Sequence, residues 1–290
     1  MSSAGDVDVF GLKMVSVQIH GGLGNQLFQY AFVYSAAKKL NSDFYLDESI
    51  DLFKCGKYFN IKESNTRIWL RNIYAFRGMH RLLFEIKRSY FKSLCCKHQL
   101  QSIFLDQSLP AEQELLKLKD GSLFIGFFQS EDYFKTQKAE LWAKFQVKTT
   151  YQKRFQKLLE KIDSNLKLVC VHVRRGDYVD LELALPLQYY KQAIELAHQV
   201  NNHYVFISDD PSFVIQNFAD IENKTISTEK EIIDFQYLIN SHVNILSNSS
   251  FSWWGAYLNK NNALTIAPKN WLGKTEQYPF NITLSNWKLI

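Results

Sequence analysis

The chain has 290 residues, of which 46% are hydrophobic, and its formal net charge at pH 7 is +5. This length accommodates one large domain or two of ordinary size, and the composition supports a sizeable core. So modest a charge does not by itself indicate nucleic acid as a partner, and the sequence holds no zinc-finger spacing or other nucleic-acid motif. We therefore expect a compact globular protein and not a linker-rich assembly.

Residues 1–13 are polar and acidic, and we interpret them as an expression leader because an apolar strand pattern starts only at Met14. The four cysteines, two of them adjacent, form no disulfide framework, which suggests a reducing compartment. No signal peptide is visible, and no apolar run reaches the length of a membrane span. These features predict a cytoplasmic protein.

The predicted order of elements after the leader is strand 15–20, glycine turn 21–24, helix 25–40 and strand 44–47. Such a βαβ unit implies a parallel sheet. In the turn, Gly22 and Gly24 allow a ligand to approach the backbone, and the helix from Asn25 directs free N–H groups toward it.

The same turn has a second interpretation as a dinucleotide fingerprint. Leu27 stands where that motif has its third Gly or Ala, which weakens the match, but Asp47 ends the second strand as a ribose-binding acid would. An NAD(P)-dependent oxidoreductase using Gly22 and Gly24 is therefore an alternative at this point.

Residues 54–98 carry eleven Lys and Arg against two Glu, with aromatic residues interleaved. The first interpretation is one or two helices with a solvated basic face. The second is a surface that contacts anionic lipid or an acidic glycan, which would place the protein peripherally at the inner face of a membrane.

A buried strand is predicted at 168–171, and it leads directly into His172-Val173-Arg174-Arg175-Gly176-Asp177-Tyr178. Ligands bind at this edge of an open α/β sheet. Two adjacent arginines call for a compensating anion, and the guanidinium fork matches phosphate oxygens. Taken alone, these residues are equally compatible with a structural Arg–Asp ion pair.

Two later predicted strands, 204–207 and 243–246, also end in polar residues. Ser249 and Ser250 precede a predicted helix, where hydroxyl groups bind phosphate or cap the helix. Asp209 and Asp210 could hold a metal, but no other acidic or His cluster has ligand spacing, so no metal is expected. Asp210 before Pro211 is also an ordinary start of a helix.

The second half thus repeats the α/β pattern, and we predict two Rossmann-like domains, 14–150 and 151–290. Their polar strand ends would form a nucleotide-diphosphate site between the domains. Asp234, on a predicted helix, could accept hydrogen bonds from a guanine edge or be a surface carboxylate.

Five segments resemble the motifs of bacterial α-1,2-fucosyltransferases of glycosyltransferase family 11, and they occur in the family's order. They are His20–Ala31, Gly126–Glu131, His172–Tyr178, Ile207–Asp210 and Ser249–Gly255. The resemblance implies a GT-B fold with two Rossmann-like domains facing a cleft. It also implies inverting transfer of fucose from GDP-β-L-fucose to the 2-hydroxyl of a galactoside, with no metal or other cofactor.

The resemblance further assigns roles to individual residues. The N-terminal domain would hold the acceptor, a galactose-terminated oligosaccharide or lipid-linked glycan in surface-glycan synthesis, and the C-terminal domain the donor. His172 and Asp234 would bind guanine, Arg174 the β-phosphate, and Ser249 and Ser250 phosphate, while Arg175 and Asp177 would shape the donor site.

Candidates for a general base are Asp177, Glu182 and Glu131, and a strongly dissociative transition state would need none. A non-catalytic module that binds a nucleotide sugar is a further alternative.

Overall fold

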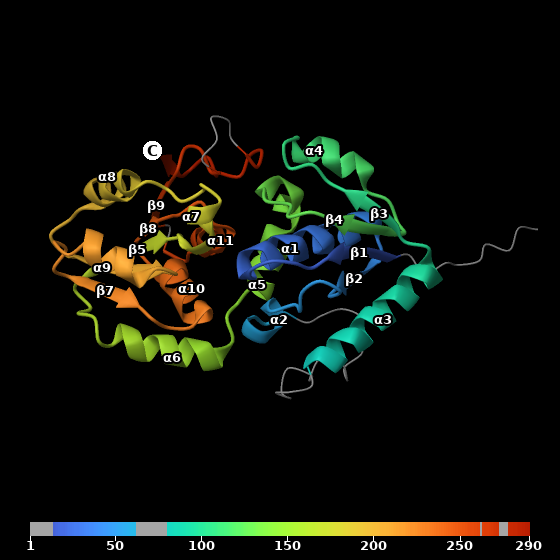
Figure 1. Cartoon of the computed structure of the whole chain (residues 1–290), viewed down its shortest axis with the longest axis horizontal. Coiled ribbons are helices and arrows are strands. Elements are labelled where there is room, and N and C mark those ends of the chain that lie inside the picture. Colours follow the sequence, from blue (N-terminus) through green and yellow to red (C-terminus); the bar gives the residue numbers. More distant parts are fainter. Residues whose placement is uncertain (1–13, 62–79, 262, 273–277) are drawn as a thin grey trace, which may run out of the picture.

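The structure is a computed structural model that describes residues 14–61, 80–261, 263–272 and 278–290. It contains two parallel β-sheets with helices packed against them, which confirms the predicted α/β class (Figure 1). The predicted leader, residues 1–13, lies outside the described residues, as do residues 62–79 of the basic segment.

The first sheet has the strand order β2-β1-β4-β3, and every pair is parallel. Its strands are β1 (Met14–Gln18), β2 (Asp43–Asp47), β3 (Gln101–Phe104) and β4 (Ser122–Ile125). Helix α1 (Leu23–Leu40) connects β1 to β2, so the predicted βαβ opening is confirmed. β3 was not predicted, because three of its four residues are exposed and the strand therefore shows no apolar pattern.

The second sheet has the order β10-β9-β8-β5-β6-β7, again with parallel pairs. Its strands are β5 (Lys167–Val173), β6 (Asn202–Ser208), β7 (Lys224–Ser227), β8 (Val243–Ile245), β9 (Leu264–Ala267) and β10 (Lys288–Leu289). Val173 of β5 pairs with Ser208 of β6. This register brings the chain after β5 and the chain after β6 side by side.

Helices surround both sheets. The remaining ones are α2 (Cys55–Tyr58), α3 (His80–His98), α4 (Ala111–Glu114), α5 (Lys138–Lys144), α6 (Thr149–Leu159), α7 (Gly176–Asp180), α8 (Leu187–Ala197), α9 (Pro211–Asn217), α10 (Glu231–Asn240) and α11 (Ser250–Tyr257), with 3₁₀ turns η2 (Leu115–Lys117), η3 (Glu131–Tyr133) and η4 (Lys135–Gln137). The predicted domain boundary at residue 150 falls at the start of α6, between the strands of the two sheets.

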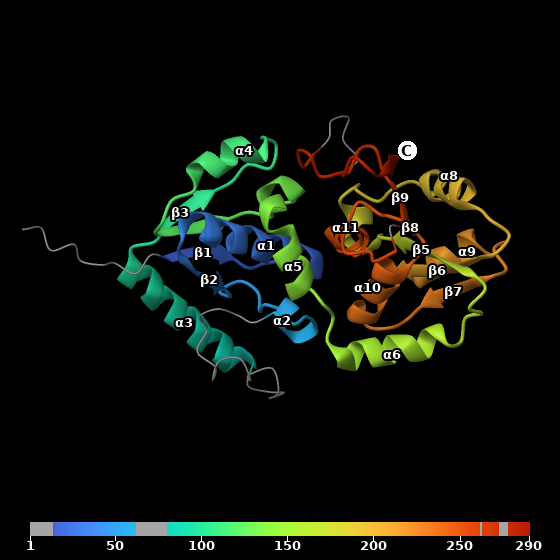
Figure 2. The same cartoon turned by 180° about the vertical axis from the view of Figure 1, so that it is seen from behind.

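Helix α3 covers the end of the basic segment and lies at the periphery, beside the first sheet (Figures 1 and 2). Arg88 and Lys92 are exposed on it, and so are the apolar side chains of Leu82 and Ile86. None of the described helices is long and apolar enough to cross a membrane. Contact of this segment with lipid stays a prediction.

Helices α1 and α11 pack against each other between the two sheets (Figure 1). The Phe28 ring lies 4.5 Å from the Trp253 ring and 5.0 Å from the Trp254 ring, measured between centroids, and Phe134 stacks on Trp254 at 5.3 Å. All four side chains are fully buried, so both tryptophans belong to the core. One apolar core thus extends from the first sheet into the second.

Candidate active site

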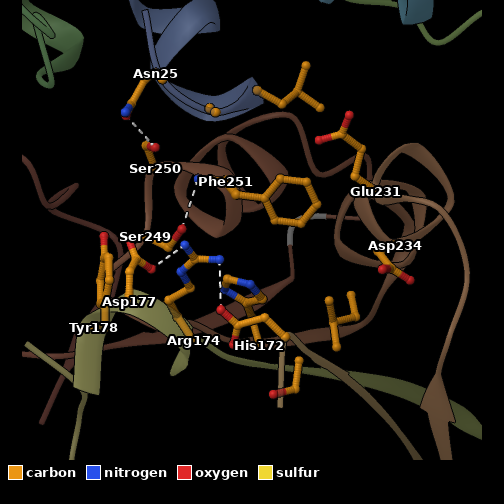
Figure 3. Close-up of a pocket in the computed structure, with 17 residues that line it drawn as sticks. Asn25, His172, Arg174, Asp177, Tyr178, Glu231, Asp234, Ser249, Ser250 and Phe251 are labelled. Carbon is orange, nitrogen blue, oxygen red and sulfur yellow. Dashed lines mark hydrogen bonds and ion pairs between the residues drawn. The ribbon is translucent and has the colours of Figure 1, made fainter. Parts of the chain in front are cut away.

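A cavity of about 460 Å³ lies where the two halves meet, at the carboxyl ends of β5 and β6 (Figure 3). Most of the predicted site residues line it: Gly22, Gly24, Asn25, His172, Arg174, Asp177, Asp234, Ser249 and Ser250. The rest of the lining consists of Gly21, Leu23, Tyr178, Ile207, Ser208, Asp209, Glu231 and Phe251. The sequence therefore located this cavity, although Arg175 and Glu131 lie outside its lining.

The glycine turn is held in place by buried polar side chains. Gly21 adopts a φ of +83°, which favours glycine, and its N–H donates to Asp51 Oδ2 at 2.8 Å. Gln26 is fully buried and donates from Nε2 to the Gly21 carbonyl at 3.2 Å, while Gln29 Oε1 accepts from the His20 N–H at 3.1 Å. The cavity wall formed by this turn is therefore preformed.

Helices α1 and α11 both begin at this cavity. Helix α1 starts after Gly22, which provides no capping side chain, and its first turn has no acidic residue. Helix α11 starts after Ser249, whose Oγ accepts from the Phe251 N–H at 3.3 Å. The Ser249 hydroxyl donates to no described residue, so its proton remains available to a ligand. Two positive dipole ends at one cavity favour an anion.

Arg174 is oriented by two carboxylates, one in α7 directly after β5 and one after the neighbouring strand β6. Its Nη1 lies 2.8 Å from Asp209 Oδ2, its Nη2 pairs with Asp177 Oδ1, and the guanidinium lies over the Tyr178 ring at 5.3 Å (Figure 3). Asp209 Oδ1 also accepts from the Arg175 backbone N–H at 2.8 Å. Since 35% of the Arg174 side chain is exposed, the oriented guanidinium can still meet an anion in the cavity.

Arg175 corrects a prediction, because its side chain diverges from that of Arg174. Its Nε donates to Asp210 Oδ2 at 3.3 Å, and its guanidinium lies 3.9 Å from the centroid of the Phe213 ring. Asp210 also caps α9 by accepting from the Phe213 N–H at 3.0 Å. Both arginines lie beyond β5, which ends at Val173, and their side chains are held by different carboxylates, so only Arg174 lines the cavity.

Glu131 requires a second correction. Ser130 caps the 3₁₀ turn η3, and the turn carries Glu131 to the far end of α11. There Glu131 Oε1 accepts from the Tyr257 hydroxyl at 2.9 Å and pairs with Lys138 Nζ at 3.0 Å. Glu131 is therefore not a general base for this cavity. Glu182 does not line it either, which leaves Asp177 among the three candidates.

Neutral and acidic groups also line the cavity. Burial and the nearby Arg174 charge lower the pKa of His172 to about 3, so its imidazole is neutral at physiological pH. The His172 ring lies 5.4 Å from that of Phe251, and its Nδ1 has no hydrogen-bond partner among the described residues. A neutral ring beside an aromatic face suits a nucleobase.

Asp234 and Glu231 both come from the first turn of α10. Burial raises the pKa of Asp234 to about 7, although the Ser227 hydroxyl donates to its Oδ1 and opposes that shift. Glu231 Oε1 accepts from the Tyr58 hydroxyl at 2.8 Å, which ties α2 of the first half to the cavity wall. The cavity thus combines carboxylates and a neutral imidazole with helix N-termini and a guanidinium, groups that suit a ligand with a base and phosphates.

Sequence reasoning missed the roles of Asp209, Glu231 and Phe251. It considered Asp209 as a metal ligand, whereas the structure gives its carboxylate to Arg174 and the Arg175 backbone. Phe251 lies inside a recognised motif, so its position was a usable signal. Glu231 gave no such signal, because a glutamate is common in the first turn of a helix. Among the described residues, no group of three or more His, Cys, Asp or Glu could hold a metal ion.

The nicotinamide alternative does not fit this cavity. Asp47, its ribose-binding acid, is 2% exposed, accepts from the Ser49 N–H at 2.9 Å and does not line the cavity. Two parallel α/β sheets flanking a cavity that the N-termini of α1 and α11 line match instead the architecture of the GT-B class of glycosyltransferases.

Comparison with known proteins gives the family. The model for glycosyl transferase family 11 matches residues 111–290. An α-1,2-colitosyltransferase of Escherichia coli is 30% identical, with 95% of this chain and 98% of the relative covered. A galactoside 2-α-L-fucosyltransferase of Caenorhabditis elegans is 25% identical over 86% of this chain and 70% of its own length. The chain belongs to glycosyltransferase family 11, and it is an enzyme of fucosyl-type glycosyl transfer.

A solved structure supports the fold independently. The fucosyltransferase NodZ from Bradyrhizobium superimposes with a TM-score of 0.54 over 85% of this chain and 91% of that chain, at 15% identity. At this identity the likeness shows the GT-B fold alone.

Proposed function

We propose that this enzyme transfers L-fucose from GDP-β-L-fucose to the 2-hydroxyl of a galactoside, with inversion, in the cytoplasmic synthesis of a surface glycan. The observation that carries the proposal is the meeting of the α1 and α11 N-termini with Arg174 in one cavity. Backbone N–H groups and a guanidinium fork are the ligands that a diphosphate prefers. The names of the two relatives, both 2-linking transferases, support the linkage.

In the proposed reaction, the acceptor oxygen bonds to the anomeric carbon of fucose while the bond from that carbon to the β-phosphate oxygen breaks. Negative charge develops on the departing GDP, and Arg174 with the two helix ends stabilises it. The acceptor proton passes to a base or to solvent. Asp177 lines the cavity and is the candidate base that remains, although it also pairs with Arg174.

The direct test is incubation of the purified chain with GDP-β-L-fucose and a β-galactoside, followed by NMR of the product. We expect an α-1,2-linked fucoside. A product with another linkage would overturn the regiochemistry, and turnover with GDP-colitose but not with GDP-fucose would overturn the donor. Tight binding of GDP-fucose without any turnover would support the non-catalytic module instead.

Transfer should continue after removal of divalent cations. Arg174 offers the charge that a metal supplies in other transferases, and the two carboxylates after β6 already bind Arg174, the Arg175 backbone and side chain, and the α9 N-terminus. We expect an unchanged initial rate after dialysis against EDTA. A rate that falls on chelation and returns with Mn²⁺ or Mg²⁺ would contradict this expectation.

GDP affinity should depend on pH through Asp234. Its carboxylate can accept hydrogen bonds from the N–H groups of a guanine edge, whereas the protonated acid cannot accept both. Binding therefore selects the deprotonated form. With a pKa of about 7 in the empty site, affinity should rise with pH up to about 7, by at most about tenfold per pH unit, and then level off.

Calorimetry in buffers of different ionisation enthalpy checks this prediction, since binding at pH 6 should release a proton. In Asp234→Asn the pH step should disappear. Ser227→Ala removes a hydrogen bond that lowers this pKa, so the step should move to higher pH. A step that persists in Asp234→Asn belongs to another group.

The same group affects the stability of the empty enzyme. Because folding raises its pKa from 3.8 to about 7, the folded protein binds a proton that the unfolded chain has released. The contribution of Asp234 to stability is therefore lost as the pH rises through that interval.

A further inference from the structure

Asn25 is the centre of a hydrogen-bond relay that joins three separate segments. Its Oδ1 accepts from the Ser250 hydroxyl of α11 at 2.6 Å and from Gln129 Nε2 at 3.0 Å. Gln129 is half-buried, follows β4 and does not line the cavity. The relay therefore connects the cavity to Gln129, a residue outside the cavity lining.

The Ser250 hydroxyl is already engaged, so it does not have the phosphate-binding role expected from the sequence. A serine hydroxyl has one proton, and that of Ser250 is directed at Asn25 Oδ1 (Figure 3). In this arrangement the Ser250 side chain cannot also donate to a phosphate. The hydroxyl of Ser249 remains available, as do the free N–H groups of both helices.

The Asn25 amide has two N–H donors that no described residue uses. Both hydrogen bonds to its amide end at Oδ1, and its Nδ2 has no partner among the described residues. Nδ2 lies over Gly21, where a Cβ would approach it to 2.6 Å, and both residues line the cavity. An amide NH₂ thus stands beside the uncapped N-terminus of α1.

We propose that Asn25 Nδ2 donates to the diphosphate of the nucleotide sugar, and that Gln129 is a positioning residue that fixes this orientation of the amide. The proposal rests on the proposed function and deepens it. Without the Gln129 donor only the Ser250 hydroxyl contacts the amide oxygen, and because a hydroxyl can accept as well as donate, the Asn25 amide can turn over and present its oxygen to the anion. Gln129 would then affect donor binding without touching the donor.

The experiment is a double-mutant cycle on GDP affinity, measured by calorimetry. Asn25→Ala should weaken GDP binding about 10- to 100-fold, as expected for a hydrogen bond to a charged group. Gln129→Ala should weaken it by a smaller factor. In the double variant, Gln129→Ala should have no further effect, because the amide that it orients is gone.

Gln129→Glu tests the orientation itself. A carboxylate at this position can only accept, so it draws Asn25 Nδ2 away from the cavity. We expect weaker GDP binding in Gln129→Glu than in Gln129→Ala. If the Asn25 amide had the opposite orientation, Gln129→Glu would preserve the contact and bind GDP at least as well as Gln129→Ala does, which would overturn the proposal.

Ser130→Ala is the matched control. Ser130 is the next residue in the same loop, but its hydroxyl bonds to the Asn281 carbonyl at 3.1 Å and it takes no part in the relay. Its GDP affinity should equal that of the wild type, and circular dichroism confirms the fold of each variant. Multiplicative effects in the double variant, or unchanged affinity in Asn25→Ala, would overturn the relay. The proposed function fails separately, if the wild type does not bind GDP or use GDP-fucose.

Discussion

Replacement of Arg174 by alanine should lower kcat/KM for the nucleotide sugar by about 2.7–4 kcal/mol, the range for losing one group that stabilises charge in the transition state. The variant loses the guanidinium at the cavity and also frees Asp177 and Asp209, which Arg174 now pairs. Two carboxylates that have lost their cation would repel a nearby diphosphate. Initial rates at varied donor concentration measure the effect.

Arg175→Ala is the matched control, since its side chain binds Asp210 and covers Phe213 outside the cavity. This variant should lose some stability and keep most of its kcat/KM. Arg174→Lys should also have a low kcat/KM, because one ammonium group cannot reproduce the two ion pairs that separate guanidinium nitrogens make. Near-native turnover by Arg174→Ala would remove this residue from the mechanism.

Gly24→Ala should damage the whole enzyme and not only its site. An added Cβ would lie 2.3 Å from the Ser250 carbonyl carbon and 2.4 Å from the Phe251 nitrogen, both backbone atoms that cannot rotate away. Overpacking of this kind costs about 1–3 kcal/mol, and here it forces α1 away from α11. Because alanine has a higher helix propensity than glycine, any loss of stability reports the close approach of α1 to the α11 backbone at Gly24. Chemical denaturation measures the free energy of unfolding.

Gly22→Ala provides the comparison two residues earlier. A Cβ there has no heavy atom within 4 Å, and Gly22 has an extended backbone with φ −72° and ψ 177°. We expect this variant to lose less than about 1 kcal/mol of stability, the usual effect of a changed N-cap. Equal destabilisation by the two substitutions would show that the contact between the helices is not what requires glycine at position 24.

The fold was predictable where the chain has strong local signals. The apolar run before His172 marked β5, and the glycine turn marked the start of α1. Strands β7 and β10 were missed because their residues are mostly half-buried or exposed, so they show no apolar pattern. The sequence therefore identified central strands better than edge strands.

The site was predictable to the level of the segment and not of the side chain. Adjacent letters in the Arg174-Arg175 pair gave no indication that one side chain turns to the cavity and the other to Asp210. Likewise, Glu131 belongs to a recognised motif, yet a 3₁₀ turn directs it away. Such outcomes depend on partners distant in sequence, which pattern alone does not specify.

The aromatic core between α1 and α11 has a consequence for protein engineering. Phe28 and Phe134 from one half enclose Trp253 and Trp254 from the other, so each half separately would expose large aromatic side chains to water. Neither half is expected to be soluble when expressed alone. Chimeras that exchange halves between relatives would need to transfer both faces of this helix pair together.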